Sequence, residues 1–371
     1  MILSPHRVLA ILRKEFIQMR RDRITFAMML GIPIIQLLLF GFAINNDPKL
    51  LPAALVGPAD DRFARAMVTA LENTGYYRFV APGITAAEAE RMLTNGSVSF
   101  VVTMAPDFGA DLLRGDRAQV LVEADATDPA AASGAISTLD TVAAQALTRE
   151  LGAALPAGGL EILIHRRYNP EGSIRLNIVP GLLGIILQMT MVMMTAMALT
   201  REIERGTMEN LLAMPATPSE IMIGKITPFL AVGGVQVTVI LTAARAIFAV
   251  PFEGAPGLLL AGVFLFVLAL VLLGYLISTV SRTQMQAMQL SIFVFLPSIL
   301  LSGFMFPFRG MPGWARMIGE VLPVTHFLRL VRAVMLKGAG LADVRAQFLT
   351  LGAMVVVLAV LALTRFRRTL D

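Results

Sequence analysis

Cysteine is absent from the 371 residues, so the chain forms no disulfide bond and offers no thiolate to a metal ion or a substrate. Histidine is nearly absent, and His6, His165 and His326 lie far apart in the sequence. Zinc sites in proteins are built from cysteine and histidine ligands brought together in one place. We therefore predict no metal site in this chain.

Charged residues are also few. They make up 15% of the chain, against about 25% in soluble domains, and hydrophobic residues reach 56%, against about 45–50%. This composition excludes an ordinary soluble protein, and it excludes a disordered chain because too much apolar surface would face water. The net charge is +5, but no basic stripe crosses a soluble domain, so we expect anchoring at a membrane surface and no nucleic-acid partner.

Catalytic motifs are missing as well. The phosphate-binding spacing G-x-x-x-x-G-K-[ST] does not occur, since Gly224-Lys225-Ile226 lacks both the first glycine and the hydroxyl residue. The motifs G-x-S-x-G and H-E-x-x-H do not occur either. We expect that this chain is not an enzyme and that it binds no cofactor itself.

Long charge-free stretches dominate what is present. Six of them have the length of a membrane span, at residues 24–46, 176–200, 226–244, 254–281, 283–308 and 346–364. The sequence therefore predicts an α-helical polytopic membrane protein with six transmembrane helices. Carriers driven by an ion gradient usually need an ionisable group inside a span, and these stretches contain none, so an ion gradient is not the expected energy source.

Basic residues set the expected orientation. Residues 1–23 hold six lysines and arginines, and the C-terminal tail holds three more at Arg365, Arg367 and Arg368. Six spans place both termini on one side, which the positive-inside rule makes the cytoplasmic side. The segment 307–345 is also basic, although it would lie outside, and it is an exception to that rule.

Three regions outside the spans have patterns of their own. In residues 1–23, apolar side chains recur at helical spacing, which predicts an amphipathic helix on the inner membrane surface. Residues 47–175 have soluble composition and predict an inserted extracytoplasmic α/β domain, with strands at 53–57, 97–104, 119–124 and 161–168. Its expected helices are 61–73, 85–93, 107–114 and 129–151. Residues 307–337 mix apolar residues with arginines and predict outer amphipathic helices or a shallow re-entrant hairpin.

The loop between the second and third spans has sharp helix signals. Gly206 is placed to end one helix, Thr207 can cap a short helix at 207–214, and Pro218 begins the next helix within a capping box. Leu211 and Leu212 give the short helix an apolar side. A compact, charged element of this kind suits the docking of another protein, and an ordinary capped loop fits equally well.

At this loop the chain resembles the permeases of ABC type-2 transporters. The resemblance is carried by three stretches: TREIERGTMENLL at 200–212, LISTVSRTQMQAMQ at 276–289 and PSILLSGFMFP at 297–307. The opening Arg13-Lys14-Glu15 fits too, as does the order of one span, a large external domain at 47–175 and a five-helix transmembrane domain at 176–371. The resemblance is weakest in the external domain.

The resemblance implies partners and roles. Such permeases pair as homo- or heterodimers in the bacterial inner membrane, a separate cytoplasmic ATPase binds ATP and Mg, and a periplasmic adaptor is a further candidate partner. Residues 1–23 would be a connecting helix, with Arg13, Lys14 and Glu15 touching the ATPase. The coupling region would comprise Glu204, Arg205, Gly206, Thr207, Met208, Glu209, Leu211 and Leu212.

The second span contains a candidate substrate path. It is rich in methionine, which suits varied apolar ligands but is more often filler on a surface that faces lipid. The candidates for the path are the polar residues Gln188 and Thr190, together with Met189 between them. The family implies export of a drug, lipid, polymer or other lipophilic or amphipathic compound.

Two other functions remain open. A mechanotransmission subunit would move its external domain without carrying substrate, but such proteins generally have fewer spans after that domain. A membrane-anchored receptor would need only two spans, and the span count disfavours it.

Overall fold

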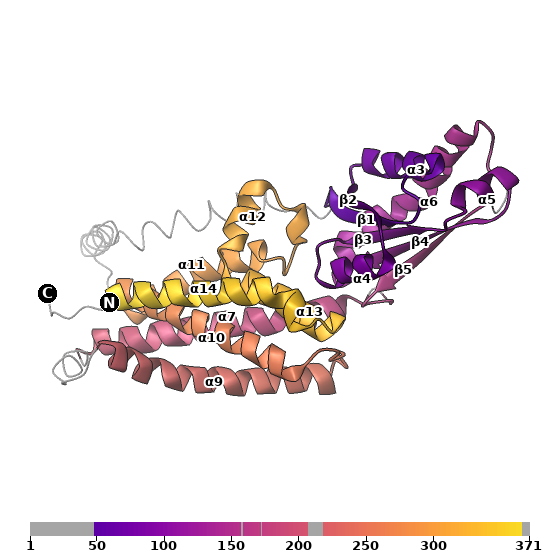
Figure 1. Cartoon of the computed structure of the whole chain (residues 1–371). Coiled ribbons are helices and arrows are strands. Elements are labelled where there is room, and N and C mark those ends of the chain that lie inside the picture. The colour runs from indigo at the N-terminus through magenta and orange to yellow at the C-terminus, as the bar shows by residue number, and fades with distance from the viewer. Residues whose placement is uncertain (1–47, 157–158, 172, 207–217, 366–371) are drawn as a thin grey trace, which may run out of the picture.

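The computed structural model describes residues 48–156, 159–171, 173–206 and 218–365. Figure 1 shows a bundle of long helices with a smaller part, built around a β-sheet, at one end of it. Among the described residues, five helices are long and apolar enough to cross a membrane. They are α7 (Ile174–Glu204), α9 (Pro218–Ala246), α10 (Pro256–Val280), α11 (Gln284–Leu301) and α14 (Leu341–Arg365). The predicted connecting helix at 1–23 and the predicted span at 24–46 lie outside the described residues.

The sheet has five strands in the order β2-β1-β3-β4-β5. β1 pairs in parallel with β2 and β3, β4 runs antiparallel to β3, and β5 runs parallel to β4. The strand bounds are β1 Leu51–Val56, β2 Tyr77–Ile84, β3 Phe100–Met104, β4 Ala118–Asp125 and β5 Leu160–Arg167.

Four strands overlap the segments predicted from the sequence, and β2 does not. Its sequence contains Pro82 and Gly83, which weaken a strand signal. β2 lies at the edge of the sheet, where a proline is tolerated because no neighbouring strand needs its N–H.

Helices cover both faces of the sheet. α3 (Arg62–Asn73), α5 (Phe108–Arg114) and α6 (Pro129–Leu151) pack on one face, and α4 (Ala86–Thr94) packs on the other. Each overlaps a predicted helix. Asp61 caps α3, since its Oδ1 accepts from the backbone N–H groups of Phe63 and Ala64 at 2.8 and 3.0 Å.

α10 is the central helix of the bundle and packs against α7, α9, α14 and α13 (Pro323–Lys337). Small residues allow this close approach. A Cβ atom on Gly274 would lie 2.7 Å from the carbonyl oxygen of Val192, so only glycine lets α10 sit this near α7. Phe266 of α10 stacks on Phe327 of α13, with ring centroids 4.2 Å apart.

The fifth charge-free stretch, 283–308, is longer than the helix it forms. α11 ends at Leu301, and the chain then turns through Gly303 at φ +84° into the short 3₁₀ turn η2 (Phe308–Gly310). A glycine in the left-handed conformation readily ends a helix. The lack of charged residues in 283–308 predicted an apolar segment, but it could not predict where the helix ends.

The region 307–337 forms α12 (Gly313–Glu320) and α13, which differ in burial. The apolar face of α13 is buried in the bundle core, so this helix does not lie on the surface. α12 instead exposes Trp314, Met317 and Ile318, and its C-cap Val321 continues this face at the spacing i, i+3, i+4 and i+7. The sequence did not distinguish these two helices.

Candidate functional site

The predicted coupling residues begin where α7 ends, at the end of the bundle away from the sheet (Figure 1). α7 stops at Glu204, Arg205 is its C-cap, and Gly206 follows at φ +69°. The backbone N–H of Gly206 bonds to the carbonyl of Ile203 at 3.2 Å. Gly206 therefore ends the helix as its sequence position predicts, because a left-handed conformation favours glycine.

Side chains join three helices at this end. Oε2 of Glu204 accepts from the backbone N and the Nε2 of Gln284, at 3.2 and 2.9 Å, and so ties α7 to the start of α11. Glu202 forms an ion pair with Lys225, which ties α7 to α9. A displacement of the chain between α7 and α9 would therefore reach α7, α9 and α11 together.

The other predicted coupling residues, Thr207, Met208, Glu209, Leu211 and Leu212, lie outside the described residues. The same holds for Arg13, Lys14 and Glu15 of the predicted connecting helix. α9 begins at Pro218, the residue that the sequence places first in the next helix.

The structure separates the three candidate substrate-path residues. Gln188 is buried, and with Met189 it lines a cavity of about 20 Å³ against α11. Thr190 faces α9, and its Oγ1 lies 2.9 Å from Oε1 of Gln236. A cavity of this size holds about one water molecule. The cavity that Gln188 and Met189 line is therefore too small for a drug-sized ligand.

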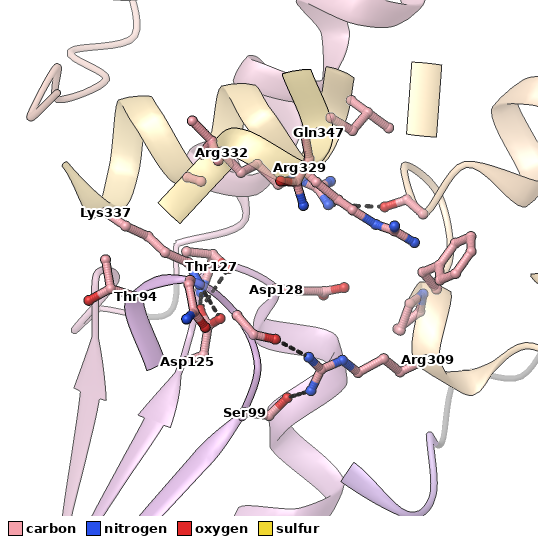
Figure 2. Close-up of a pocket in the computed structure, with 18 of the residues that line it drawn as sticks. Thr94, Ser99, Asp125, Thr127, Asp128, Arg309, Arg329, Arg332, Lys337 and Gln347 are labelled. Carbon is pink, nitrogen blue, oxygen red and sulfur yellow. Dashed lines mark hydrogen bonds and ion pairs between the residues drawn. The ribbon is translucent and has the colours of Figure 1, made fainter. Parts of the chain in front are cut away.

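A larger cavity lies between the sheet part and the helix bundle, and sequence reasoning missed it (Figure 2). Its volume is about 390 Å³, and we call it the interdomain cavity. The sheet part contributes loops after α4 and β4, and the bundle contributes η2, α13 and α14. Its charged lining residues are Asp125, Asp128, Arg309, Arg329, Arg332, Lys337 and Asp343.

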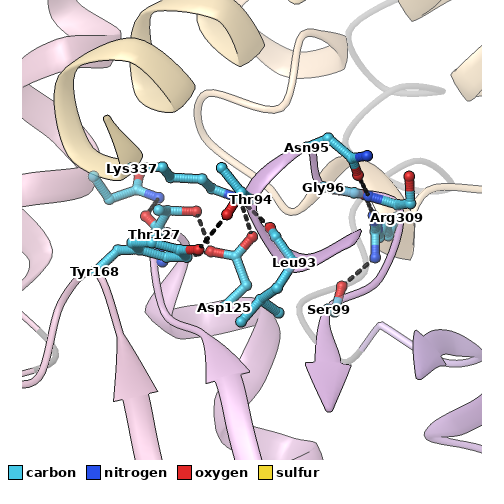
Figure 3. Close-up of polar contacts among 12 residues, drawn as sticks. Leu93, Thr94, Asn95, Gly96, Ser99, Asp125, Thr127, Tyr168, Arg309 and Lys337 are labelled. Atoms are coloured by element: carbon cyan, nitrogen blue, oxygen red, sulfur yellow. Dashed lines mark hydrogen bonds and ion pairs between the residues drawn. The ribbon is translucent and has the colours of Figure 1, made fainter. Parts of the chain in front are cut away.

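Two basic residues fasten the sheet part across this cavity (Figure 3). Nζ of Lys337 donates to Oδ2 of Asp125 at 2.5 Å and to the carbonyl of Leu93 at 3.2 Å. Arg309 donates to Oγ of Ser99 and, at 2.5 Å, to the carbonyl of Gly96. Each contact joins residues more than 200 positions apart in the chain.

Neutral groups hold two of the arginines. The partners of Arg309 are a hydroxyl and a carbonyl, and Arg332 donates to the carbonyl of Gly303 at 3.0 Å and to Oδ1 of Asn177 at 3.1 Å. Burial lowers the pKa of both guanidinium groups. Asp125 partly offsets this effect at Arg309, and Asp128 and then Asp125 do so at Arg332. Arginine nevertheless stays protonated in proteins, so both carry a positive charge.

The only signal for these residues in the sequence was the basic character of 307–345 on the expected outer side. The structure gives it a local reason, since Arg309 and Lys337 contact the sheet part and Arg329 pairs with Glu320. Their partners could not be read from the sequence, because nothing in the local pattern connects positions so far apart.

Comparison with known proteins gives consistent matches. The family described as ABC-2 family transporter protein matches residues 23–364. The chain is 33% identical to the inner membrane transport permease YhhJ of Escherichia coli over 339 residues, which are 87% of this chain and 86% of that protein. It is 27% identical to the probable multidrug ABC transporter permease YbhR of Escherichia coli, over 91% of both chains. It is 28% identical to ABC transporter G family member 20 of Dictyostelium discoideum, over 90% of this chain and 46% of that protein.

Proposed function

The chain belongs to the ABC-2 family of transporter proteins, and from this premise we propose that it is the membrane permease subunit of an ATP-driven exporter. The family confirms the resemblance read from the sequence, and the matching relatives are named as permeases. A separate cytoplasmic ATPase binds ATP and Mg and supplies the energy. Two permeases, identical or different, form the transport unit.

The observation that best supports this proposal is the fastening of three helices at one end of the bundle. Glu204 holds Gln284, and Glu202 holds Lys225, beside the segment that would meet the ATPase. A push there would move α7, α9 and α11 as a unit. A permease that has no ATPase of its own needs such a movement, because the separate ATPase subunit must shift the spanning helices.

The proposed orientation places this end in the cytoplasm and the sheet part outside a bacterial inner membrane. The basic residues of 1–23 support it through the positive-inside rule. A first span at 24–46 then leads outward to the sheet, and both chain ends are cytoplasmic. A periplasmic adaptor would meet the sheet part.

The proposed substrate is lipophilic or amphipathic. The described spans carry ionisable residues only near their ends, which suits such a compound better than a small ion. The relative YbhR is named as a probable multidrug permease, which agrees with this class. The second candidate is mechanotransmission, which the docking of the sheet part onto the bundle by Lys337 and Arg309 favours.

Transport in vesicles tests the proposal and separates the two candidates. The chain is reconstituted with its ATPase, and uptake of a lipophilic dye into inside-out vesicles is measured with and without ATP. Export requires ATP-dependent uptake. ATP hydrolysis without uptake, accompanied by movement of the sheet part, would support mechanotransmission and contradict export.

Two variants probe the coupling end. Glu204→Lys removes the acceptor for Gln284, and Gly206→Pro cannot keep φ at +69°, because proline is restricted to about −65°. We expect both to lose uptake while the complex still assembles. Glu150→Lys makes the same charge reversal at an exposed position of α6, at the other end of the molecule, and should leave uptake unchanged. Normal uptake by both coupling variants would contradict the assignment.

A further inference from the structure

We propose that the interdomain cavity binds the phosphate-bearing headgroup of an anionic lipid, held by Arg309 and Arg332. This inference goes beyond the proposed function and does not depend on export. At about 390 Å³ the cavity lies in the usual range for small-ligand sites, about 300–1,000 Å³. That volume suits a headgroup and excludes a whole lipid.

Two of the four basic residues that line the cavity have no ion-pair partner among the described residues. Lys337 is matched by Asp125, and Arg329 by a bidentate pair with Glu320 at 2.6 and 3.0 Å. Arg309 and Arg332 form no ion pair among the described residues, and their bonds go to neutral groups. Asp125 and Asp128 also line the cavity and act on these guanidinium groups, but not as ion-pair partners. Partly buried guanidinium groups without a carboxylate in direct contact attract an anion, and arginine binds phosphate oxygens well.

Within the described part of the chain, three residues of the cavity lining carry buried polar atoms without a bond. Nε of Arg332, Oγ of Ser302 and Oε1 of Gln347 are buried without a hydrogen-bond partner among the described residues. All three residues line the cavity. Buried polar groups in proteins are nearly always bonded. The three atoms are enclosed by the protein as they stand, so a phosphate or a headgroup hydroxyl in the cavity would bond them after a small shift of their side chains.

α12 lies beside the cavity, next to a second hollow in the surface. A neighbouring hollow of about 540 Å³ shares Phe308 and Arg309 with it and is also lined by Met317 of α12. The exposed apolar face of α12, with Trp314 and Met317, suits the boundary between lipid headgroups and acyl chains. A lipid at that boundary can place its headgroup between the arginines while its chains follow α12.

Native mass spectrometry of the delipidated full-length chain in detergent tests the proposal. The probes are dihexanoyl phosphatidylglycerol, dihexanoyl phosphatidylcholine and inorganic phosphate. We expect saturable binding of phosphatidylglycerol, at least about tenfold tighter than of phosphatidylcholine and weakened by salt. Inorganic phosphate that binds as tightly would keep the anion site but identify a soluble phosphate compound as its ligand. Equal binding of the two lipids, or no binding of any probe, would overturn the proposal.

Variants assign the binding to the arginines. Arg309→Gln and Arg332→Gln should each weaken phosphatidylglycerol binding about tenfold or more, because each removes charge-assisted hydrogen bonds. Ser302→Ala and Arg332→Lys are milder changes that should weaken binding about threefold to tenfold even if the glutamine variants misfold. Arg117→Gln is the matched control, since Arg117 lies outside the cavity and pairs with Glu161, and it should change binding less than about twofold. Unchanged binding in Ser302→Ala and Arg332→Lys would overturn the assignment.

Discussion

The ion pair between Lys337 and Asp125 is expected to hold the sheet part on the bundle. The side chains are 7% and 15% exposed, so solvent screens the pair poorly. Removing one partner of a buried pair costs about 3–5 kcal/mol, because the other charge is stranded. In Lys337→Met the carboxylate of Asp125 still accepts a hydrogen bond from the hydroxyl of Thr127 at 2.7 Å. We therefore expect a loss at the lower end of this range, about 3 kcal/mol.

Hydrogen exchange of the full-length protein measures this loss. A change of about 3 kcal/mol raises the population of the undocked state about 10²-fold, so amides near Leu93 and Thr127 should exchange faster by that factor. Arg117→Met is the control, because it breaks an exposed pair with Glu161 at 3.6 Å and should have almost no effect. Unchanged protection in Lys337→Met would refute the view that this pair fastens the two parts.

Three further predictions follow from single residues. Gly274→Ala should lower the melting temperature, because its Cβ would lie 2.7 Å from a backbone oxygen, whereas Gly257→Ala on the same helix meets open space; equal melting curves would contradict the close packing of α10 on α7. Asp61→Ala should destabilise α3 by about 1 kcal/mol through loss of its cap, measured as faster amide exchange in that helix; unaltered exchange would show that the cap contributes nothing. The chain has no cysteine, so single-cysteine variants report topology: Leu163→Cys should react with an impermeant maleimide in spheroplasts and Arg205→Cys only after permeabilisation, and the reverse pattern would invert the orientation.

Regular, repeated patterns were predictable from the sequence. The five described spans overlap charge-free stretches, and β1, β3, β4 and β5 fall on alternating or apolar runs, because helix and strand periods are written locally in the chain. Gly206 was predictable for the same reason, since a glycine after a helical run ends it.

Contacts between distant segments were not predictable. The end of α11 before Gly303 follows from one backbone conformation, which an apolar run does not reveal. The burial of α13 depends on which helices surround it, and its sequence fits a surface helix equally well. Arg309 and Ser99 are 210 positions apart in the chain. The basic segment 307–345 was visible in the sequence as an exception to the positive-inside rule, but its partners in the sheet part were not.

The most direct test of the central claim, a permease driven by a separate ATPase, is co-purification in mild detergent from the native membrane. The tagged chain and its Glu204→Lys variant are compared, and bound proteins and ATP hydrolysis are measured. We predict that a P-loop ATPase co-purifies with the unaltered chain and hydrolyses ATP, and that it also co-purifies with the variant, whose complex still assembles. A chain that purifies alone, without ATP hydrolysis under any mild detergent condition, would contradict the claim.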